Sequence, residues 1–243
     1  RLRAGDYTLP GNVSSQFVTG MLYALPLLAD TSTLTVTPPV ESAGYIHMTL
    51  QCLRESGIVL DEIGPWQWRI PGNQQYRAQN AALPGDWSQG AVLLCAGALG
   101  HAVTTAGLAL DSTQGDRAAL TVLHQLGACF AEPPQGLVPA EAPLHGIIFS
   151  GRDIPDIVPV LALTCTQAVG ESRITDCGRL RLKESDRFAA TVELLTALGA
   201  DIHGEGDTLV VHGPAPLHGG VTLDARNDHR LVMLLALAGS IAD

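Results

Sequence analysis

Lysine is almost absent from this sequence of 243 residues, where Lys183 stands alone beside thirteen arginines. Basic side chains are few altogether, because 14 Lys and Arg face 24 Asp and Glu and give a formal charge of −10. A general nucleic-acid binder needs a basic face for the phosphate backbone, so this balance argues against that class. Small anionic ligands need only local basic charge. Seven of the fourteen basic residues fall between Arg173 and Arg230, which is the first sign of a site.

Several motifs that mark common functional sites are missing. The sequence has no CxxC pair, no zinc-finger spacing of His and Cys, and no HExxH, P-loop, GxGxxG, EF-hand or GxSxG pattern. These absences disfavour zinc hydrolases, P-loop enzymes, dinucleotide enzymes and esterases. The odd number of widely spaced cysteines favours buried thiols in a reducing cytosol. They are Cys52, Cys95, Cys129, Cys165 and Cys177.

A membrane segment is not expected either. The chain opens without the pattern of a signal peptide. The uncharged stretch 91–110 is long enough for a membrane span, but three glycines, two threonines and His101 make its hydropathy modest. We interpret it as a buried helix, a turn at Gly100 and then a strand. The composition, with 46% apolar residues, is typical of one large globular domain or two smaller ones.

The chain repeats one plan with a period of about 71 residues. A capping residue precedes an apolar helix, a β-rich segment follows, and a second helix then ends at a glycine. The expected starts of the first helices, spaced 72, 70 and 72 residues apart, are Ser14, Asp86, Asp156 and Asp228. The glycines that end the second helices, where positive φ is needed, are Gly57, Gly127 and Gly199. The unit reads β-α-β-α-β-β, which predicts an α/β fold with helices covering parallel strands.

The repeat also predicts how the chain is divided. The segment 74–83, which precedes Pro84-Gly85, predicts a boundary between two domains near residue 83. The chain begins inside one unit and stops just after the first helix of a fourth. Both ends therefore look cut, and we expect part of a longer protein.

Some helix starts carry polar groups beyond an ordinary cap. A helix N-terminus has free N–H donors and a positive dipole end, so it can hold a phosphate or a carboxylate. Ser14, Ser15 and Gln16 add three donors at one such end, although capping by one serine is the simpler explanation. Asp156 is either a helix cap or a general base, a role that a pKa raised by burial would favour.

The segment 179–187 carries the densest charge of the chain. Leu180 and Leu182 alternate with basic residues, which predicts a strand with one polar face before the next helix. Lys183, Glu184 and Arg187 then lie one turn apart, where they can clamp a dianion and supply an acid–base pair. Lys183 differs from the arginines because its pKa can fall far enough for proton transfer. A solvated charged face is the alternative.

Two further positions are candidates. Asp228 is expected to cap the last helix, and Arg230 on its first turn to reach a phosphate, whereas His229 fits a packed or solvent-facing residue. Ser42 and Tyr45 precede the second helix of the first unit, at the same repeat position as Lys183–Arg187. A turn is the simpler explanation for Ser42 and Tyr45.

The motifs, in their order, resemble the 5-enolpyruvylshikimate-3-phosphate (EPSP) synthase family over essentially the whole chain. They are Ser14-Ser15-Gln16-Phe17, Pro84-Gly85-Asp86, Ile154-Pro155-Asp156, Lys183-Glu184-Ser185-Asp186-Arg187 and Asn227-Asp228-His229-Arg230. UDP-N-acetylglucosamine enolpyruvyl transferases share the repeat but lack the Ser-Ser-Gln and Lys-Glu-Ser-Asp-Arg combination. The family has six repeats in two domains, with the active site between them. The resemblance thus implies that 1–82 is the last repeat of the first, shikimate 3-phosphate-binding domain and that 83–243 is most of the second.

The resemblance implies an enzyme of aromatic amino acid biosynthesis. The reaction transfers the enolpyruvyl group of phosphoenolpyruvate to the 5-hydroxyl of shikimate 3-phosphate and releases phosphate. The resemblance implies no metal or organic cofactor, and we expect a monomeric parent protein. The cysteines indicate a cytoplasmic location, and the charge and hydropathy indicate no nucleic-acid or membrane partner. Asp156 is the implied base on the 5-hydroxyl, Glu184 moves a proton at the methylene carbon, and Lys183 contacts both substrates. The implied substrate-binding residues are Ser14, Ser15, Gln16, Ser42 and Tyr45 for shikimate 3-phosphate, and Arg187 and Arg230 for phosphoenolpyruvate, together with His229.

The chain departs from the family pattern in its extent. Other family contacts would lie before Arg1 or after Asp243, so the fragment alone is expected to have little or no turnover. Arg179 stands where some members carry an asparagine. Two other classes stay open, namely a non-catalytic anion-binding module of the same fold and a purely structural scaffold.

Overall fold

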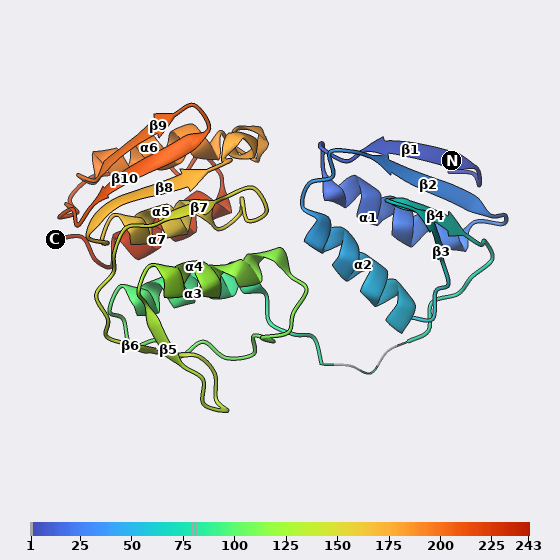
Figure 1. Cartoon of the computed structure of the whole chain (residues 1–243), viewed down its shortest axis with the longest axis horizontal. Helices are drawn as coiled ribbons and strands as arrows, with labels where there is room; N and C mark the ends of the chain where they lie inside the picture. Colours follow the sequence, from blue (N-terminus) through green and yellow to red (C-terminus); the bar gives the residue numbers. More distant parts are fainter. Residues whose placement is uncertain (1, 79, 81) are drawn as a thin grey trace. The chain divides into compact units, whose positions relative to one another are not determined.

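The computed structural model describes residues 2–78, 80 and 82–243, which form two compact units (Figure 1). Unit 1 extends to Leu83 and includes Thr113–Gly115, and unit 2 comprises Pro84–Ser112 and Asp116–Asp243. The segment 74–83, at which a boundary was expected, includes residues 79 and 81, which lie outside the described residues. No helix within the described ranges has the length and apolar character that crossing a membrane requires.

Unit 1 is one β-α-β-α-β-β repeat. Its elements are β1 (Asp6–Pro10), α1 (Ser15–Ala24), the 3₁₀ helix η1 (Leu25–Leu27), β2 (Ser32–Thr37), α2 (Ala43–Glu55), β3 (Asp61–Gly64) and β4 (Gln67–Ile70). The sheet has the order β1-β2-β4-β3, in which β1 and β2 are parallel and β4 is antiparallel to both of its neighbours.

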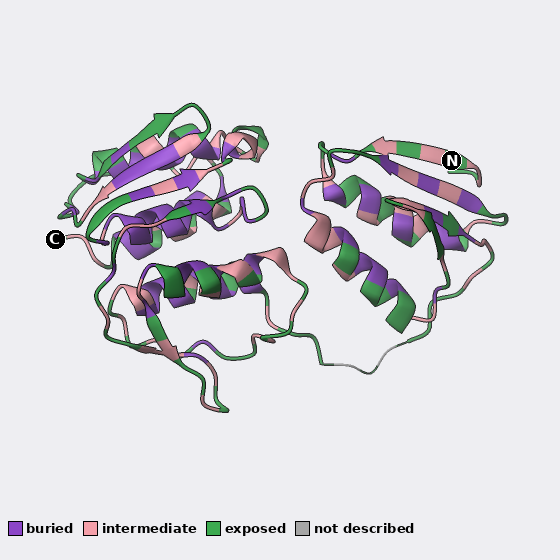
Figure 2. Ribbon diagram, in the orientation of Figure 1, coloured by how far each residue is buried: buried purple, intermediate pink, exposed green. Residues whose placement is uncertain are grey.

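The core of unit 1 lies between this sheet and its two helices. Alternate residues of β2, including Leu34 and Val36, are buried on the face toward the helices (Figure 2). Leu22 of α1 and Leu53 of α2 are also buried, as is Trp68 of β4. Full burial of such an apolar side chain contributes about 1.5–3 kcal/mol, so this layer holds the starts of α1 and α2 in place.

Unit 2 holds one reduced repeat, one complete repeat and the first helix of another. The reduced repeat consists of α3 (Trp87–Ala98), η2 (Gly115–Arg117), α4 (Ala118–Gln125), β5 (Cys129–Ala131) and β6 (Val138–Ala140). The complete repeat consists of β7 (Ile148–Ser150), α5 (Val158–Cys165), β8 (Gly170–Thr175), η3 (Gly178–Leu182), α6 (Arg187–Ala197), β9 (Asp201–Glu205) and β10 (Thr208–Gly213). The last helix is α7 (His229–Ala238). The sheet order β7-β8-β10-β9 repeats the topology of unit 1.

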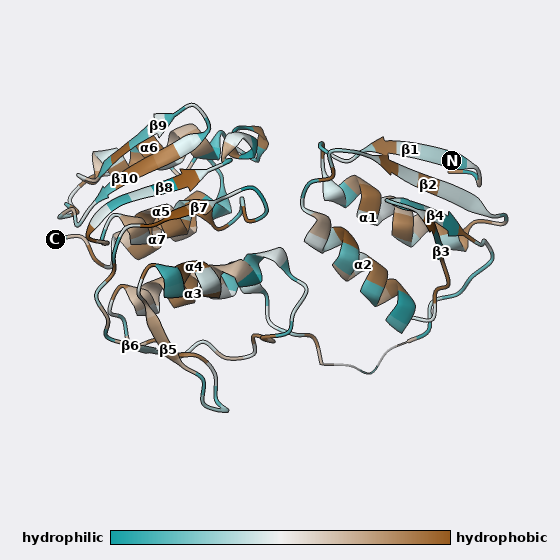
Figure 3. Cartoon of the chain, viewed as in Figure 1, coloured by the Kyte–Doolittle hydropathy of each residue, from teal (hydrophilic) through white to brown (hydrophobic). Residues whose placement is uncertain are grey.

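Helix α5 forms the centre of unit 2. Every residue from Val158 to Cys165 is buried, and the helix contacts α3, α6, α7 and the strands β8 and β10. A helix that is apolar on all sides must be surrounded by other elements. Figure 3 shows this helix and its neighbours as a hydrophobic layer beneath the sheet. The loops before α5, α6 and α7 are thereby fixed to one rigid core.

The predicted repeat is confirmed by the positions of the helices. The first helices of successive units begin at Ser15, Trp87, Val158 and His229, which are 72, 71 and 71 residues apart. The second helices end just before Gly57, Gly127 and Gly199, whose φ angles are 79°, 102° and 96°. Glycine is needed there because a side chain strains this left-handed conformation.

Two local predictions were wrong. The strand expected after Gly100 is reduced to an isolated bridge between Thr105 and Leu137, and the chain bends two residues later at Gly107, whose φ is 80°. The strand expected at 179–183 is instead the 3₁₀ helix η3. In that helix Leu180 is buried while Leu182 is 83% exposed, so the two leucines do not share a face.

Candidate functional site

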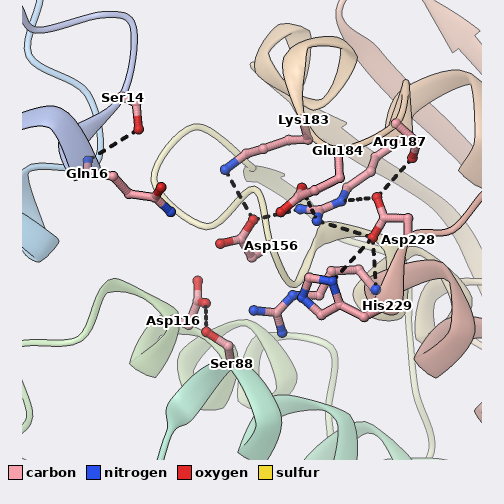
Figure 4. Close-up of polar contacts among 12 residues, drawn as sticks. Ser14, Gln16, Ser88, Asp116, Asp156, Lys183, Glu184, Arg187, Asp228 and His229 are labelled. Atoms are coloured by element: carbon pink, nitrogen blue, oxygen red, sulfur yellow. Dashed lines mark hydrogen bonds and ion pairs between the residues drawn. The ribbon is translucent and has the colours of Figure 1, made fainter.

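A buried arginine, Arg187, organises a cluster of charges in unit 2. It is the first residue of α6, and its side chain is only 1% exposed. Its guanidinium donates through Nη1 to Asp156 Oδ1 (2.7 Å), through Nη2 to Glu184 Oε2 (2.5 Å) and through Nε to Asp228 Oδ2 (2.8 Å). A second bond from Nη2 reaches Asp228 Oδ1 at 3.2 Å, which makes this pair bidentate. Figure 4 shows the three carboxylates gathered around this one side chain.

Asp156 holds Lys183 as well as Arg187. Lys183 Nζ lies 3.2 Å from Asp156 Oδ1, and both side chains are largely buried. Asp156 does not cap α5, because Ile157 occupies the N-cap position and makes no side-chain cap bond. Capping was one of the two roles predicted for Asp156, and the structure excludes it. The carboxylate is engaged by two cations from the loop before α6 and the start of that helix.

Asp228 links the beginnings of two helices. It caps α7, because its Oδ1 accepts from the backbone N–H of Arg230 at 2.9 Å. Its Oδ2 accepts from Ser185 Oγ at 2.9 Å as well as from Arg187. Asp228 is completely buried, so these bonds replace the water that its charge would otherwise bind.

The cations outweigh the effect of burial on these carboxyls. Burial alone would raise the pKa of Asp156, but Lys183, Arg187 and Arg230 together hold that pKa below its ordinary value. Burial likewise opposes ionisation of Asp228, yet the bonds from Arg187, Arg230 N–H and Ser185 lower its pKa. Both groups are therefore carboxylates at neutral pH. The raised pKa that would favour a general base at Asp156 is not found.

Arg230 differs from Arg187 in its partners. It lies in the first turn of α7, close enough to Asp156 to lower the pKa of that carboxyl. Its Nε and Nη1 atoms are shielded from solvent and have no hydrogen-bond partner among the described residues. The two residues that precede Asp228 are Arg226 and Asn227, and their φ angles are 53° and 55°. This strained turn sets the direction in which α7 begins. Arg230 thus offers unused donors beside the N-terminus of a ten-residue helix.

Lys183, Glu184 and Arg187 meet without sharing a helical turn. Lys183 ends η3 and α6 begins only at Arg187, so Lys183 and Glu184 lie in the connecting loop. Glu184 is 56% exposed, in contrast to the other two carboxylates bound to Arg187. His229 at the start of α7 is also exposed, with its Nδ1 3.9 Å from Asp228 Oδ1. Because Arg187 engages all three carboxylates, this cluster does not fit a metal site.

In unit 1, the predicted serines stand at the start of α1. Ser14 is the N-cap, and its Oγ accepts from the backbone N–H of Gln16 at 3.2 Å. Ser15 is buried, whereas the Gln16 side chain lies on the exposed surface of the first turn. Capping therefore accounts for Ser14 alone, and the functions of Ser15 and Gln16 stay predictions.

Ser42 and Tyr45 lie together at the start of α2. Ser42 is buried and has φ of 53°, a conformation that is uncommon for a residue with a side chain. Its carbonyl accepts from the Tyr45 N–H at 3.1 Å, so the turn expected there is present. Helices α1 and α2 are held together by the bond between Thr19 and Thr49 Oγ1 (2.9 Å). The two helix starts that carry the predicted residues are thus fixed to each other within unit 1.

Two buried acids were not recognised as structural centres from the sequence. Asp228 was expected only as a cap, because its partner Arg187 lies 41 residues away. Asp116, in η2, is buried and accepts a hydrogen bond from Ser88 Oγ in the first turn of α3. A polar residue within a short loop gave no signal of burial.

The lowered pKa values predict acid sensitivity of unit 2. Asp156 and Asp228 have folded-state pKa values below 3.8, so their ionisation stabilises the folded state above that value. We expect the free energy of unfolding to fall as the pH decreases from about 5 through the folded-state pKa values. The Asp228→Asn variant should lose less stability over this range than the wild type. Urea denaturation followed by circular dichroism at a series of pH values measures both slopes.

The exposed Asp30 of unit 1 provides a control for this experiment. Asp30→Asn removes a carboxyl outside the cluster and gives the slope against which Asp228→Asn is compared. An Asp228→Asn variant with the wild-type slope would show that Asp228 does not link protonation to unfolding.

Comparison with known proteins shows the family to which this chain belongs. The family profile described as EPSP synthase (3-phosphoshikimate 1-carboxyvinyltransferase) matches residues 2–243. The 3-phosphoshikimate 1-carboxyvinyltransferase of Clostridium beijerinckii is 37% identical over 242 residues, which cover 99% of this chain and 56% of the relative. The Clostridioides difficile protein of the same name is 35% identical over 243 residues and is also covered to 56%. The chain thus spans about half the length of the curated relatives it matches.

Solved structures share the fold. EPSP synthase from Acinetobacter baumannii aligns with a TM-score of 0.78 at 23% identity, covering all of this chain and 57% of that one. The enolpyruvyl transferase NikO from Streptomyces tendae aligns with a TM-score of 0.73 at 22% identity, with coverage of 100% and 58%. At these identities the likeness concerns the fold alone, but the family profile spans nearly every residue. The repeats, the charged cluster and the match over 2–243 agree, and the chain belongs to the EPSP synthase family.

Proposed function

We propose that the protein carrying these residues transfers the enolpyruvyl group of phosphoenolpyruvate to the 5-hydroxyl of shikimate 3-phosphate and releases phosphate. The chain covers 56% of the relatives named for this reaction, so the proposal concerns the whole protein. The observation that carries it is Arg230, whose shielded guanidinium donors have no partner among the described residues although it stands beside a fully bonded ion-pair cluster. A cation held in this way is prepared for an anion that arrives from solution.

Phosphoenolpyruvate is proposed to bind at this point of unit 2. Arg230 donates to its phosphate or carboxylate, and the nearby N-terminus of α7 favours the same charge. Lys183 adds a second cation, held by Asp156 at 3.2 Å. Asp228 fixes the start of α7 through the Arg230 N–H, so the site is ordered before the substrate arrives.

Arg187 is proposed to take part through exchange of a partner. Its guanidinium is committed to three carboxylates, of which only that of Glu184 is mainly exposed. A substrate carboxylate can replace Glu184 at Nη2 without uncovering a buried charge. The exchange releases the Glu184 carboxyl, which in its protonated form gives its proton to the methylene carbon during the addition and takes a proton back from that carbon when phosphate leaves.

Asp156 is proposed as the base for the 5-hydroxyl. Its pKa is held low by Lys183 and Arg187, which makes it a weak proton acceptor in the free protein. Binding of anions to these two cations reduces their hold on Asp156, and its pKa rises toward the range a base needs. Proton transfer is thereby tied to the presence of substrate.

Shikimate 3-phosphate is proposed to bind unit 1. Its phosphate faces Ser14, Ser15 and Gln16 at the N-terminus of α1, and Ser42 and Tyr45 contribute from the start of α2. Support for this assignment is that α1 and α2 are held together by the Thr19–Thr49 bond. We also propose that residues 1–82 form the last repeat of the domain that binds this substrate, and 83–243 most of the second domain.

The remaining proposals concern the setting of the enzyme. Five free cysteines support a reducing cytoplasm. A net charge of −10 supports the absence of a nucleic-acid partner. We propose a monomer without a membrane partner. A non-catalytic anion-binding module of the same fold is the alternative, and release of phosphate from both substrates by the whole protein distinguishes the two.

Calorimetric titration of the 243-residue chain tests the binding assignments. Ser15→Ala should weaken binding of shikimate 3-phosphate, and Lys183→Ala should weaken binding of phosphoenolpyruvate, each by about tenfold or more, because each change removes a bond to an anion. Thr8→Ala on β1 serves as a control away from both helix starts. Unchanged affinities in Ser15→Ala and Lys183→Ala would reject these assignments.

A further inference from the structure

The outer face of the sheet in unit 2 carries a row of histidines and carboxylates. Strand register places His212 of β10 opposite Asp201 of β9 on one side and opposite Glu171 of β8 on the other. His203, two residues along β9 from Asp201, lies on the same face because side chains alternate along a strand. The opposite face holds buried residues such as Ile202 and Val211, so these polar groups are directed away from the core.

The potential ligand atoms of Asp201, His203 and His212 lie close together. One ligand atom from each residue falls within 4.8 Å of the other two. His212 Nδ1 is shielded from solvent and has no hydrogen-bond partner in the described chain, although Asp201 Oδ2 is only 3.5 Å away. The two imidazole rings are nearly parallel, with centroids 6.1 Å apart and planes inclined by 18°.

A second ring of residues orients both imidazoles. His212 Nε2 lies 3.2 Å from Glu171 Oε2, and His203 Nε2 lies 3.3 Å from Glu205 Oε1. Because a carboxylate only accepts, each Nε2 is the donor in these bonds, and in a neutral imidazole Nδ1 is then the nitrogen that can bind a metal. Arg173 binds both glutamates, at 3.3 Å from Glu171 Oε1 and through a second bond to Glu205. Metal-binding histidines are held in this way, with the other ring nitrogen on a carboxylate.

We propose that Asp201, His203 and His212 form a binding site for a divalent transition-metal ion of the zinc class. Two imidazole nitrogens and one carboxylate oxygen form a ligand set typical of Zn²⁺, and water completes the tetrahedron. Ligand atoms that lie about 2.0–2.2 Å from Zn²⁺ in a tetrahedral site are roughly 3.4 Å from one another. Side-chain rotations that move the three ligand atoms by about 1 Å would bring them to this separation. Glu171 and Glu205 outnumber Arg173, so the surrounding charge favours a cation.

A simple network of hydrogen bonds on the sheet surface is the competing explanation. Such a network satisfies Glu171, Glu205 and Arg173 equally well, but it gives His212 Nδ1 no bond. It predicts no saturable uptake of Zn²⁺. The site uses none of the residues of the Arg187 cluster, so the proposal does not rest on the proposed enzyme reaction.

Calorimetric titration with Zn²⁺, in the 243-residue chain carrying Cys52→Ser and Cys129→Ser, tests the proposal. These two changes remove the exposed thiols, which also bind zinc. We expect one ion per chain, and His203→Gln and His212→Gln should each bind at least tenfold more weakly. Glu171→Gln removes a negative charge that holds the His212 ring and favours a cation, so it should also weaken binding by about tenfold. Co²⁺ should give the visible absorption of a tetrahedral site.

An exposed histidine on α4, His124, provides the control. His124→Gln should bind Zn²⁺ as tightly as the parent chain, and circular dichroism should show each variant folded. Absence of saturable binding in the parent chain would overturn the proposal. Equal affinity in the parent, His203→Gln and His212→Gln would overturn it as well, because the ion would then bind elsewhere.

Discussion

Replacing Arg187 with methionine is expected to lower the free energy of unfolding by about 3–5 kcal/mol. The substitution preserves much of the side-chain volume but leaves Asp228, which is completely buried, without its bidentate partner. Asp156 also loses a bond of 2.7 Å. The bonds from Ser185 Oγ and the Arg230 N–H remain, but neither supplies the positive charge that offsets a buried carboxylate. Loss of this single arginine should therefore weaken α6 and α7 together.

Urea denaturation followed by circular dichroism measures the change, and hydrogen exchange of α6 and α7 shows where it occurs. Arg152→Met is the matched control, because Arg152 forms an ion pair of similar length, 2.9 Å to Asp176, on the exposed surface. An ion pair exposed to water contributes little to stability, so the control should remain close to the wild type. If Arg187→Met were no less stable than Arg152→Met, the cluster would not be held together by Arg187.

Replacing Arg230 with alanine is expected to weaken binding of phosphoenolpyruvate by about tenfold to a hundredfold. A hydrogen bond to a charged group contributes about 1.5–3 kcal/mol, and each 1.4 kcal/mol corresponds to tenfold in affinity. The fold should tolerate the change, because Arg230 Nε and Nη1 have no hydrogen-bond partner among the described residues. The substitution therefore leaves no buried acceptor without those two donors. The cap of α7 uses the backbone N–H of Arg230, which alanine retains.

Calorimetry with phosphoenolpyruvate measures this effect, and Arg226→Ala is the matched control. Arg226 lies four residues earlier in the same segment, and its guanidinium binds Glu193 on the surface of α6. Removing it deletes one positive charge at a similar place without removing the proposed contact. Similar losses in the two variants would mean that only the general field of unit 2 attracts the anion.

The repeat was predictable because it depends on local chemistry. A capping side chain acts on a backbone N–H two or three residues away, and a helix-ending glycine acts on its own φ angle. Ser14, Asp86 and Asp228 therefore proved to be caps, and Gly57, Gly127 and Gly199 have positive φ. The family resemblance depends on the same runs of residues, and the profile match to EPSP synthases confirms it.

The partners of the charged residues were not predictable in the same way. Two of the three carboxylate partners of Arg187, Asp156 and Asp228, are 31 and 41 residues distant in sequence. Only the packing of α5, α6 and α7 brings these groups together. The alternation of leucines and basic residues at 179–183 predicted a strand that is not present. The chain turns at Asp176, where φ is 58°, and then forms the 3₁₀ helix η3. The pattern of apolar and charged residues in a short segment does not predict a turn that depends on tertiary packing.

The proposed function requires a site for shikimate 3-phosphate. Titration of the wild-type chain with this anion, compared with titration with shikimate, tests that requirement most directly. The two ligands differ only by the phosphate that the start of α1 is proposed to hold. We predict saturable binding of one molecule of shikimate 3-phosphate per chain. Shikimate should bind at least about tenfold more weakly, because it cannot form the charge-assisted hydrogen bonds of the phosphate. Equal binding of the two ligands, or no saturable binding of shikimate 3-phosphate, would contradict it.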